Sequence, residues 1–315
     1  MSIRTALVFA AIAAAAATLS LTAAADGIAA KTARIPAAAR GNLQAQIEAA
    51  RASDPAAFEA VASVKMHRPE VYKHFRNPLP TAVSRELRGL GAAALMPMLQ
   101  ALAFDAPERG SLTDVEWDAL AAGMLEATGV LRDARSAPVL HAVFESDGLR
   151  APVIGAAARA LGRLGGDAEL ALLTKHTAAG DARRMAAIEG LGQLRRIEAA
   201  QYLADLLQGS NDDATAAAIS DALGKLGSSW AWKALGAGAA ARGLATREVC
   251  ARALVGGLVR NQGAARTAAR DGLVMVEHPS TGGMLQSARG TASPDAVRAI
   301  DEVGPRLAQA QKPRR

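Results

Sequence analysis

The chain has 315 residues, of which 50% are hydrophobic and only 3% aromatic, and its 36 Lys and Arg against 30 Asp and Glu give a formal charge of +6. The abundance of Ala and Leu favours packed helices and excludes sheet-based folds, because Ala is the strongest helix former and β-branched residues are sparse. A single Cys excludes a disulfide framework and a Cys-ligated zinc, and the few aromatic residues argue against a platform that stacks nucleic-acid bases.

The first 25 residues have the pattern of a secretory signal peptide. One positive charge at Arg4 precedes an apolar run from Ala6 to Leu21, and small residues follow up to Asp26. An uncleaved membrane anchor is the alternative, although this run is short and rich in Ala for a membrane-spanning helix. The sequence therefore predicts cleavage near Ala25, a periplasmic or secreted location, and no membrane span in the mature chain.

Residues 26–80 predict an N-terminal helical cap or a degenerate repeat. Helices are expected over Gly41 to Ala52 and over Pro55 to Lys65, with Asp54 as the N-cap of the second. The run Asn77-Pro78-Leu79-Pro80 then interrupts the helical pattern. A terminal unit of a repeat protein needs one polar outer face, which this flank would supply.

A glycine-centred phrase recurs between residues 81 and 276. The clearest copy is Leu161-Gly162-Arg163-Leu164-Gly165, and further copies are centred on the glycines at positions 129, 192, 224 and 256. The period of about 32 residues is typical of helical-repeat proteins. An upstream copy at Leu87 to Gly91 is followed by extra residues around Phe104 to Leu112, which are expected to form a loop.

Each copy of the phrase predicts a pair of helices. Apolar residues at helical spacing, such as Ile154 and Leu161, precede the glycine, and a second helix is expected a few residues later. Thr113 to Glu116 has the pattern of a capping box before the helix that leads to Gly129. Because such hairpins cannot bury their apolar faces alone, they are expected to stack. The predicted fold is all-α: an α-solenoid of about six helical hairpins with irregular helical flanks.

The alternation of Ala, Leu and Gly in Ala160-Leu161-Gly162-Arg163-Leu164-Gly165 resembles the short HEAT-like repeats of the phycobilisome-lyase type. The resemblance covers roughly Thr81 to Gly272 and implies an α-solenoid whose second helices line a concave, partner-binding surface. It says little about activity. No catalytic residue of the lyases can be matched here, and the His-Glu dipeptides through which deoxyhypusine hydroxylases of this architecture bind metal are absent.

Residues 277–315 predict a C-terminal helical cap and a basic tail. His278 to Gly283 interrupts the repeat pattern, helices are expected over Met284 to Arg289 and over Ala296 to Val303, and Lys312 to Arg315 forms the tail. The expected organisation is therefore a signal peptide over 1–25, a cap over 26–80, a solenoid over 81–276 and a second cap over 277–315.

The sequence contains no convincing motif for catalysis or cofactor binding. It has no GxSxG elbow, no phosphate-binding loop and no HExxH, and His67 and His74 lack the spacing of a zinc helix. Cys250 aligns with small residues of other repeats and is expected to be buried. Trp232 is expected in the core and Trp230 at the surface. We therefore predict no catalytic residue, no cofactor, no metal site, and a protein that is not an enzyme.

The excess of basic residues and the positions expected to be exposed on the second helices together indicate a binding partner. Arg outnumbers Lys 29 to 7, and the stretch from Arg242 to Asp271 is strongly basic, so a ridge of guanidinium groups could bind an acidic protein or an anionic envelope polymer. The alternative is a solvated outer face whose Arg bias reflects codon composition. The candidate contacts are the exposed positions expected on second helices: His141, Glu145, Lys175, Asp205, Gln208, Lys233, Arg266 and Arg270.

The favoured function is an exported scaffold that binds a protein partner in the cell envelope, with no nucleic-acid role. One alternative is an accessory subunit or an enzyme whose site is assembled across repeats, and another is a structural or chaperone-like envelope protein. An enzyme would bring acidic residues or His together in one groove, and the sequence does not indicate such a convergence.

Overall fold

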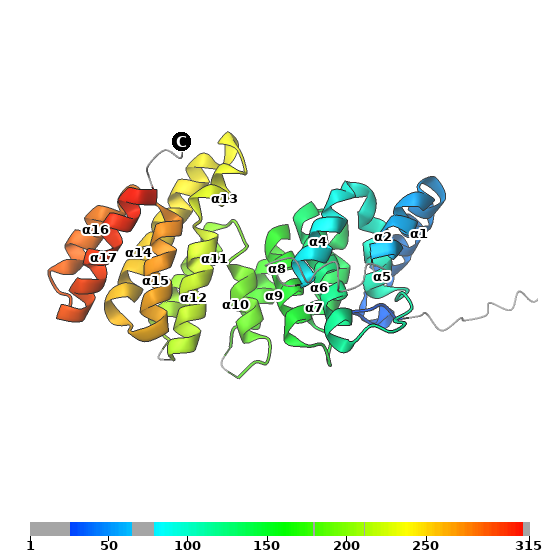
Figure 1. Ribbon diagram of the computed structural model, residues 1–315, viewed down its shortest axis with the longest axis horizontal. Coiled ribbons are helices and arrows are strands. Elements are labelled where there is room, and N and C mark those ends of the chain that lie inside the picture. The colour runs from blue at the N-terminus through cyan, green and yellow to red at the C-terminus, as the bar shows by residue number, and fades with distance from the viewer. Residues whose placement is uncertain (1–25, 65–78, 179, 211, 311–315) are drawn as a thin grey trace, which may run out of the picture.

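The computed structural model describes residues 26–64, 79–178, 180–210 and 212–310. Over these ranges the chain is helical with no strand, and its helices lie side by side along the long axis of the molecule (Figure 1). No helix in the same ranges combines the length and apolarity needed to cross a bilayer. The predicted signal peptide, His67, His74, the Asn77-Pro78 pair and the basic tail lie outside the described residues.

The solenoid consists of two rows of helices. The first row is α4 (Leu79–Gly89), α6 (Asp114–Leu131), α8 (Ala151–Leu164), α10 (Arg184–Leu191), α12 (Asp213–Leu226), α15 (Gly263–Val276) and α17 (Pro294–Ala310). The second row is α5 (Leu95–Ala103), α7 (Ala137–Phe144), α9 (Asp167–Lys175), α11 (Ile197–Gln208), α14 (Ala240–Arg260) and α16 (Thr281–Arg289). Consecutive first-row helices pack on one another, which confirms the predicted all-α solenoid of helical hairpins.

The remaining helices are short or lie at the N-terminal end. The two N-terminal helices α1 (Ala37–Ser53) and α2 (Pro55–Val64) pack against α5, and α13 (Ser229–Lys233) lies between α12 and α14. The 3-10 helices are η1 (Thr32–Arg34), η2 (Gly91–Ala94), η3 (Ala134–Ser136) and η4 (Ala237–Ala239). Of these helices, η1, α1 and α2 lie within residues 26–80, for which the sequence predicts an N-terminal cap, and the domain boundaries stay a prediction.

Local capping signals in the sequence are confirmed. Thr113 and Glu116 form a reciprocal capping box at the start of α6, with the Glu116 carboxylate 2.8 Å from the Thr113 amide. Asp54 accepts a hydrogen bond of 3.2 Å from the Ala57 amide at the start of α2. Both caps satisfy backbone amides that have no partner inside the helix, which fixes where each helix begins.

The register glycines mark the closest approaches between first-row helices. A Cβ at Gly162 of α8 would lie 2.0 Å from the Gly190 carbonyl oxygen of α10, and one at Gly192 would lie 2.9 Å from the Ala222 Cα of α12. Leu161, Leu191 and Leu223, each next to a register glycine, are all fully buried. The phrase therefore recurs because each repeat needs an interior Leu followed by one position without a side chain.

The register assigned to Gly256 is wrong. Gly256 lies in α14, which takes a place in the second row, and a Cβ there would meet only the Arg260 side chain. The glycine opposite Gly224 is instead Gly272 of α15, with its Cα 2.8 Å from the Cβ position. The cause is local: α13 ends at Lys233, and Gly236 adopts a φ of 83°, so the expected second helix is cut short and α14 takes its place.

Ion pairs join the first-row helices across consecutive repeats. The Glu126 carboxylate of α6 contacts Arg159 and Arg163 of α8 at 2.5 Å, and Arg159 also contacts Glu189 of α10 at 2.8 Å. Burial by itself raises the pKa of the Glu126 carboxyl, but the two guanidiniums outweigh this effect, so the pKa is lowered from its ordinary 4.5.

We expect Glu126→Gln to lower the free energy of unfolding by about 2 kcal/mol at neutral pH, because it weakens two charge-assisted hydrogen bonds. The pKa of Glu126 is lower in the folded state than in the unfolded state, so between these two pKa values the unfolded state binds more protons. The stabilisation is therefore present above pH 4.5 and is lost as the pH falls through the pKa of the folded state. Urea unfolding followed by circular dichroism should show the two curves converging below pH 4.5.

The matched control is Glu248→Gln, because among the described residues Glu248 forms an ion pair with just the exposed Arg252, one helical turn away, at 2.7 Å. This pair should contribute no more than about 0.5 kcal/mol. A difference between the wild type and Glu126→Gln that stays constant from neutral to acidic pH would contradict the role given to the carboxylate charge.

Candidate functional site

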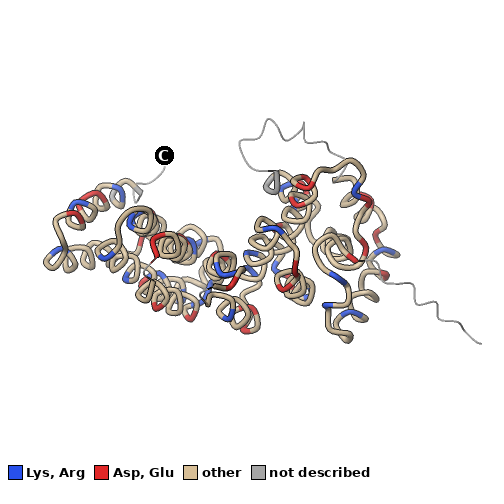
Figure 2. The backbone as a smooth tube through the Cα atoms, turned by 90° about the horizontal axis from the view of Figure 1, so that it is seen from below, with Lys and Arg blue, Asp and Glu red and all other residues tan. Residues whose placement is uncertain are grey.

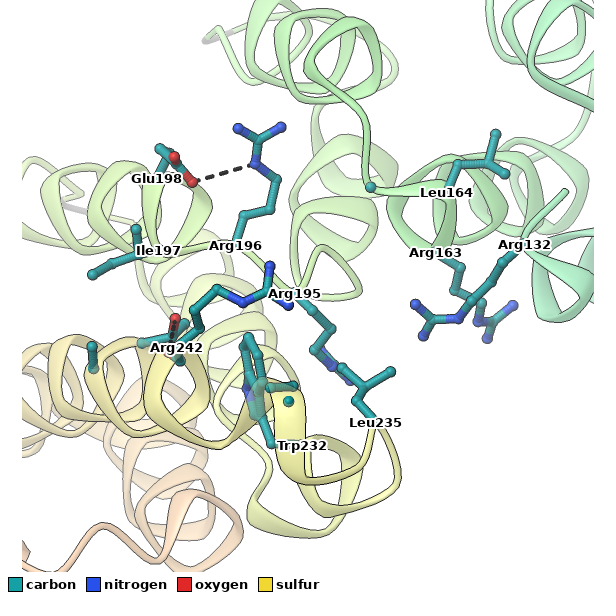
Figure 3. A pocket seen from close by; sticks show the side chains of 15 residues that line it. Arg132, Arg163, Leu164, Arg195, Arg196, Ile197, Glu198, Trp232, Leu235 and Arg242 are labelled. Atoms are coloured by element: carbon teal, nitrogen blue, oxygen red, sulfur yellow. Dashed lines mark hydrogen bonds and ion pairs between the residues drawn. The ribbon is translucent and has the colours of Figure 1, made fainter. Parts of the chain in front are cut away.

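A pocket of about 860 Å³ opens between the ends of α8 and α10 and the start of α14. Figure 3 shows the side chains that line it. Five of them are arginines and only one, Glu198, is acidic; the arginines are Arg132, Arg163, Arg195, Arg196 and Arg242. We call this cavity the arginine pocket. Acidic and basic residues are interspersed along the described parts of the chain (Figure 2), so five arginines around one carboxylate are a local excess of positive charge.

Helix ends place the arginines around the pocket. Arg132 follows the last residue of α6 and has a left-handed backbone with φ of 53°, and Arg163 lies in the last turn of α8. Arg195 and Arg196 lie between α10 and α11, and Arg242 lies in the first turn of α14. Because successive repeats end at the same side of the solenoid, residues far apart in the sequence meet here.

Only part of this positive charge is balanced by carboxylates. Arg163 pairs with Glu126, and Arg196 contacts Asp167 at 2.5 Å and Glu198 at 3.3 Å. Within the described ranges, no carboxylate pairs with Arg132, Arg195 or Arg242. Arg195 donates only to backbone carbonyls, at 3.1 Å to Gly192 and 3.4 Å to Leu226.

The uncompensated charge shows in the pKa values. Burial, reinforced by the nearby Arg132 and Arg163 guanidiniums, lowers the pKa of Arg195 to about 10. Burial and the neighbouring Arg163 also lower the pKa of Arg132. Both groups stay protonated at neutral pH, so each carries a charge that its surroundings disfavour. An anion in the pocket would relieve this cost.

Apolar side chains form the wall beside the arginines. Trp232 is only 5% exposed, and its indole Nε1 donates a hydrogen bond of 2.8 Å to the Leu226 carbonyl. Leu235 is partly exposed at the rim, and Trp230 is 76% exposed on α13. The sequence-based expectation for both tryptophans is confirmed. A ligand here would meet charge on one side and an apolar wall on the other.

A groove of about 620 Å³ between α11 and α14 adjoins the arginine pocket, with which it shares Ile197 and Ala245. Small side chains of α14 form part of its lining, and charged or polar side chains such as Asp205, Gln208 and Arg260 contribute the rest. Pocket and groove thus adjoin each other beside α11 and α14.

The structure brings together some of the predicted contact residues. His141 Nε2 lies 2.8 Å from the carboxylate of the buried Glu169, and Lys175 Nζ lies 3.7 Å from Glu145. Asp205 and Gln208 line the groove, and Lys233 ends α13. Arg266 and Arg270 lie on α15 in the first row, because the register slips at α14.

None of the eight predicted residues lines the arginine pocket. Sequence reasoning missed Arg132 in particular, and the available signal was positional. Arg132 and Arg195 each lie three residues after a register glycine, Gly129 and Gly192. Repeat positions that carry the same charge in neighbouring units are expected to converge at one end of a solenoid.

The described residues contain no cluster of three or more His, Cys, Asp or Glu that could hold a metal ion. Cys250 is buried as expected, and burial raises the pKa of its thiol to about 12. A thiol with such a pKa is a poor nucleophile at neutral pH. The chemistry of this surface is therefore that of guanidinium groups.

No protein-family model and no curated protein sequence matches the chain. Human deoxyhypusine hydroxylase in complex with glycerol is similar over 82% of this chain and 99% of that chain, at 15% sequence identity and a TM-score of 0.30. The complex of CpcE and CpcF of phycocyanin lyase from Nostoc sp. PCC7120 is similar over 63% of this chain and 91% of that chain, at 20% identity and a TM-score of 0.32.

Both similarities have low TM-scores and low sequence identity. They concern the arrangement of helices alone. The comparison contradicts the prediction that the chain is not an enzyme, because deoxyhypusine hydroxylase is an enzyme built on such helices. The absence of familiar motifs in the sequence therefore does not exclude catalysis.

Proposed function

We propose that this protein is an exported helical-repeat scaffold of the cell envelope that holds an acidic segment of a partner protein in the arginine pocket. The observation that supports this most directly is the set of five arginines that share a single pocket with one carboxylate. Arginine clusters recognise acidic motifs through paired donors, and desolvated arginines beside aromatic residues are typical centres of binding energy. The location rests on the N-terminal sequence pattern and is tested by cell fractionation.

The adjoining groove supports a partner of this kind. Its shared boundary with the pocket allows a segment to continue from the arginines along α11 and α14. Gln208, Asp205 and Arg260 offer polar contacts along this path, whereas the net positive charge is confined to the pocket end. The acidic part of the segment would therefore lie in the pocket, and this charge complementarity would fix its direction.

The test is the affinity of a fluorescein-labelled peptide of alternating Glu and Gly, measured by fluorescence anisotropy at low ionic strength. We expect the double variant Arg132→Glu and Arg242→Glu to weaken binding by at least about tenfold, since both side chains face the pocket without an acidic partner of their own. Both residues are exposed, so folding should be unaffected.

The matched control is the double variant Arg289→Glu and Arg298→Glu on α16 and α17, which changes the net charge equally but far from the pocket along the chain. It should change the affinity by less than about twofold. Equal losses in the two double variants, or equal binding of a Lys and Gly peptide, would show that the attraction is diffuse and would refute the proposal.

A further inference from the structure

Three of the pocket arginines converge from three different repeats. Arg132 and Arg163 lie next to each other on one wall, and Arg195 extends from the opposite wall toward the same space (Figure 3). Each of the three is close enough to influence the others, because the charges of Arg132 and Arg163 both act on Arg195, and Arg163 acts on Arg132. We call these three residues the arginine triad.

The charge around the triad is positive by about two units. Glu126 is shared by Arg163 and Arg159, and Glu189 contacts Arg159 and, at 4.0 Å, Lys225. Glu198, the one carboxylate in the pocket lining, contacts Arg196. Arg132 and Arg195 are therefore without a counter-ion among the described residues. A ligand that balances this site carries two negative charges in a small volume.

A phosphoryl group meets that requirement better than a carboxylate. A phosphate monoester carries a charge of about −1.5 to −2 at pH 7 and presents three acceptor oxygens in different directions, whereas a carboxylate carries one charge and two oxygens in a plane. Guanidinium groups on two facing walls can reach different oxygens of one phosphoryl group, and each guanidinium can donate in pairs.

The protein holds one of these donors in place before any ligand arrives. The guanidinium of Arg195 is tied to the Gly192 and Leu226 carbonyls at the ends of α10 and α12, and it is largely buried. A donor that is already fixed loses little conformational freedom when it binds an anion. The remaining pocket volume, bounded by Trp232 and Leu235, leaves room for an organic group attached to the phosphate.

We infer that Arg132, Arg163 and Arg195 form a binding subsite for one phosphoryl dianion, either inorganic phosphate or the phosphate of a monoester. This subsite lies within the arginine pocket and shares Arg132 with the acidic-segment proposal, but it does not require that an acidic segment binds. Occupancy would join α6, α8 and the loop after α10 through one anion. Phosphate would then stabilise the solenoid by binding the folded state alone.

The experiment is isothermal titration of the full chain with sodium phosphate at constant ionic strength, with sodium acetate as the carboxylate comparison. We expect measurable phosphate binding, at least tenfold tighter than acetate, together with a phosphate-dependent rise in the melting temperature. Arg132→Gln should weaken phosphate binding at least tenfold, and Arg195→Lys should weaken it while keeping the charge. Arg289→Gln on α16, which is far from the pocket along the chain, is the control and should change it by less than about twofold.

Two further arms identify the source of the phosphoryl group. Tighter binding of glycerol 3-phosphate than of inorganic phosphate would support a monoester ligand, and equal or weaker binding would support free phosphate. Co-sedimentation with vesicles that contain phosphatidic acid, lost in Arg132→Gln, would support a lipid headgroup. Phosphate binding no tighter than acetate, or weakened equally by Arg132→Gln and Arg289→Gln, would overturn the subsite. Failure of the acidic peptide to bind while phosphate still binds would refute only the proposed function.

Discussion

Replacing Gly162 by Ala is expected to lower the free energy of unfolding by about 3 kcal/mol, at the upper end of the usual range for overpacking a close interface. The added Cβ would lie 2.0 Å from the Gly190 carbonyl oxygen and 2.8 Å from the Gln193 Cβ, so α8 and α10 must move apart. This loss outweighs the gain in helix propensity that Ala normally brings over Gly. Urea unfolding monitored by circular dichroism measures the change.

The control is Gly41→Ala in α1, where nothing lies within 4 Å of the added Cβ and the position is exposed. There the substitution should stabilise the protein by about 0.5 to 1 kcal/mol, since only the propensity difference remains. If both alanine variants changed stability by similar amounts, the register glycine would be a matter of helix propensity and not of close packing.

Replacing Trp232 by Ala is expected to cost about 4 kcal/mol of stability, within the range measured for large aromatic side chains removed from a core. The indole is buried against Gly243 and donates to the Leu226 carbonyl, so its removal leaves a cavity and breaks this hydrogen bond. It also removes the apolar wall of the arginine pocket. Thermal unfolding should show a clearly lowered midpoint.

Trp230 provides the comparison, since it lies two residues away but is 76% exposed. Trp230→Ala should change the free energy of unfolding by less than about 0.5 kcal/mol, as expected for a surface position. A loss for Trp230→Ala as large as that for Trp232→Ala would mean that the exposed indole packs against something that the described residues do not include.

The glycine phrase predicts the solenoid well and one repeat wrongly. Gly129, Gly162, Gly192 and Gly224 each lie against the next first-row helix, whereas Gly256 copies their sequence context without their environment. The repeated sequence shows only that small residues and leucines alternate. Helix α14 has the same alternation around Gly256, although it lies in the second row. Only the early end of α13 decides that Gly272 takes the place opposite Gly224.

The candidate site follows a similar division. Alignment of the second helices of the repeats predicts Asp205 and Gln208 as contact residues, and both line the groove. It does not lead to Arg132 or Arg242, because their side chains reach the pocket from a helix end and from a helix start that lie more than a hundred residues apart in the chain. The excess of Arg over Lys indicates that guanidinium groups carry the binding chemistry, but it does not show where on the molecule they gather.

The sequence by itself determined that this chain is helical, that its hairpins repeat with a period of about 32 residues, and where local caps begin its helices, because these properties depend on neighbours within one or two turns. The tertiary structure alone decided which arginines face one another, which of them lack a carboxylate, and which row α14 joins. Those outcomes depend on how each hairpin lies on the next, and small differences in turn length accumulate from repeat to repeat. Arginines that lie far apart in the sequence are thereby brought together around one pocket.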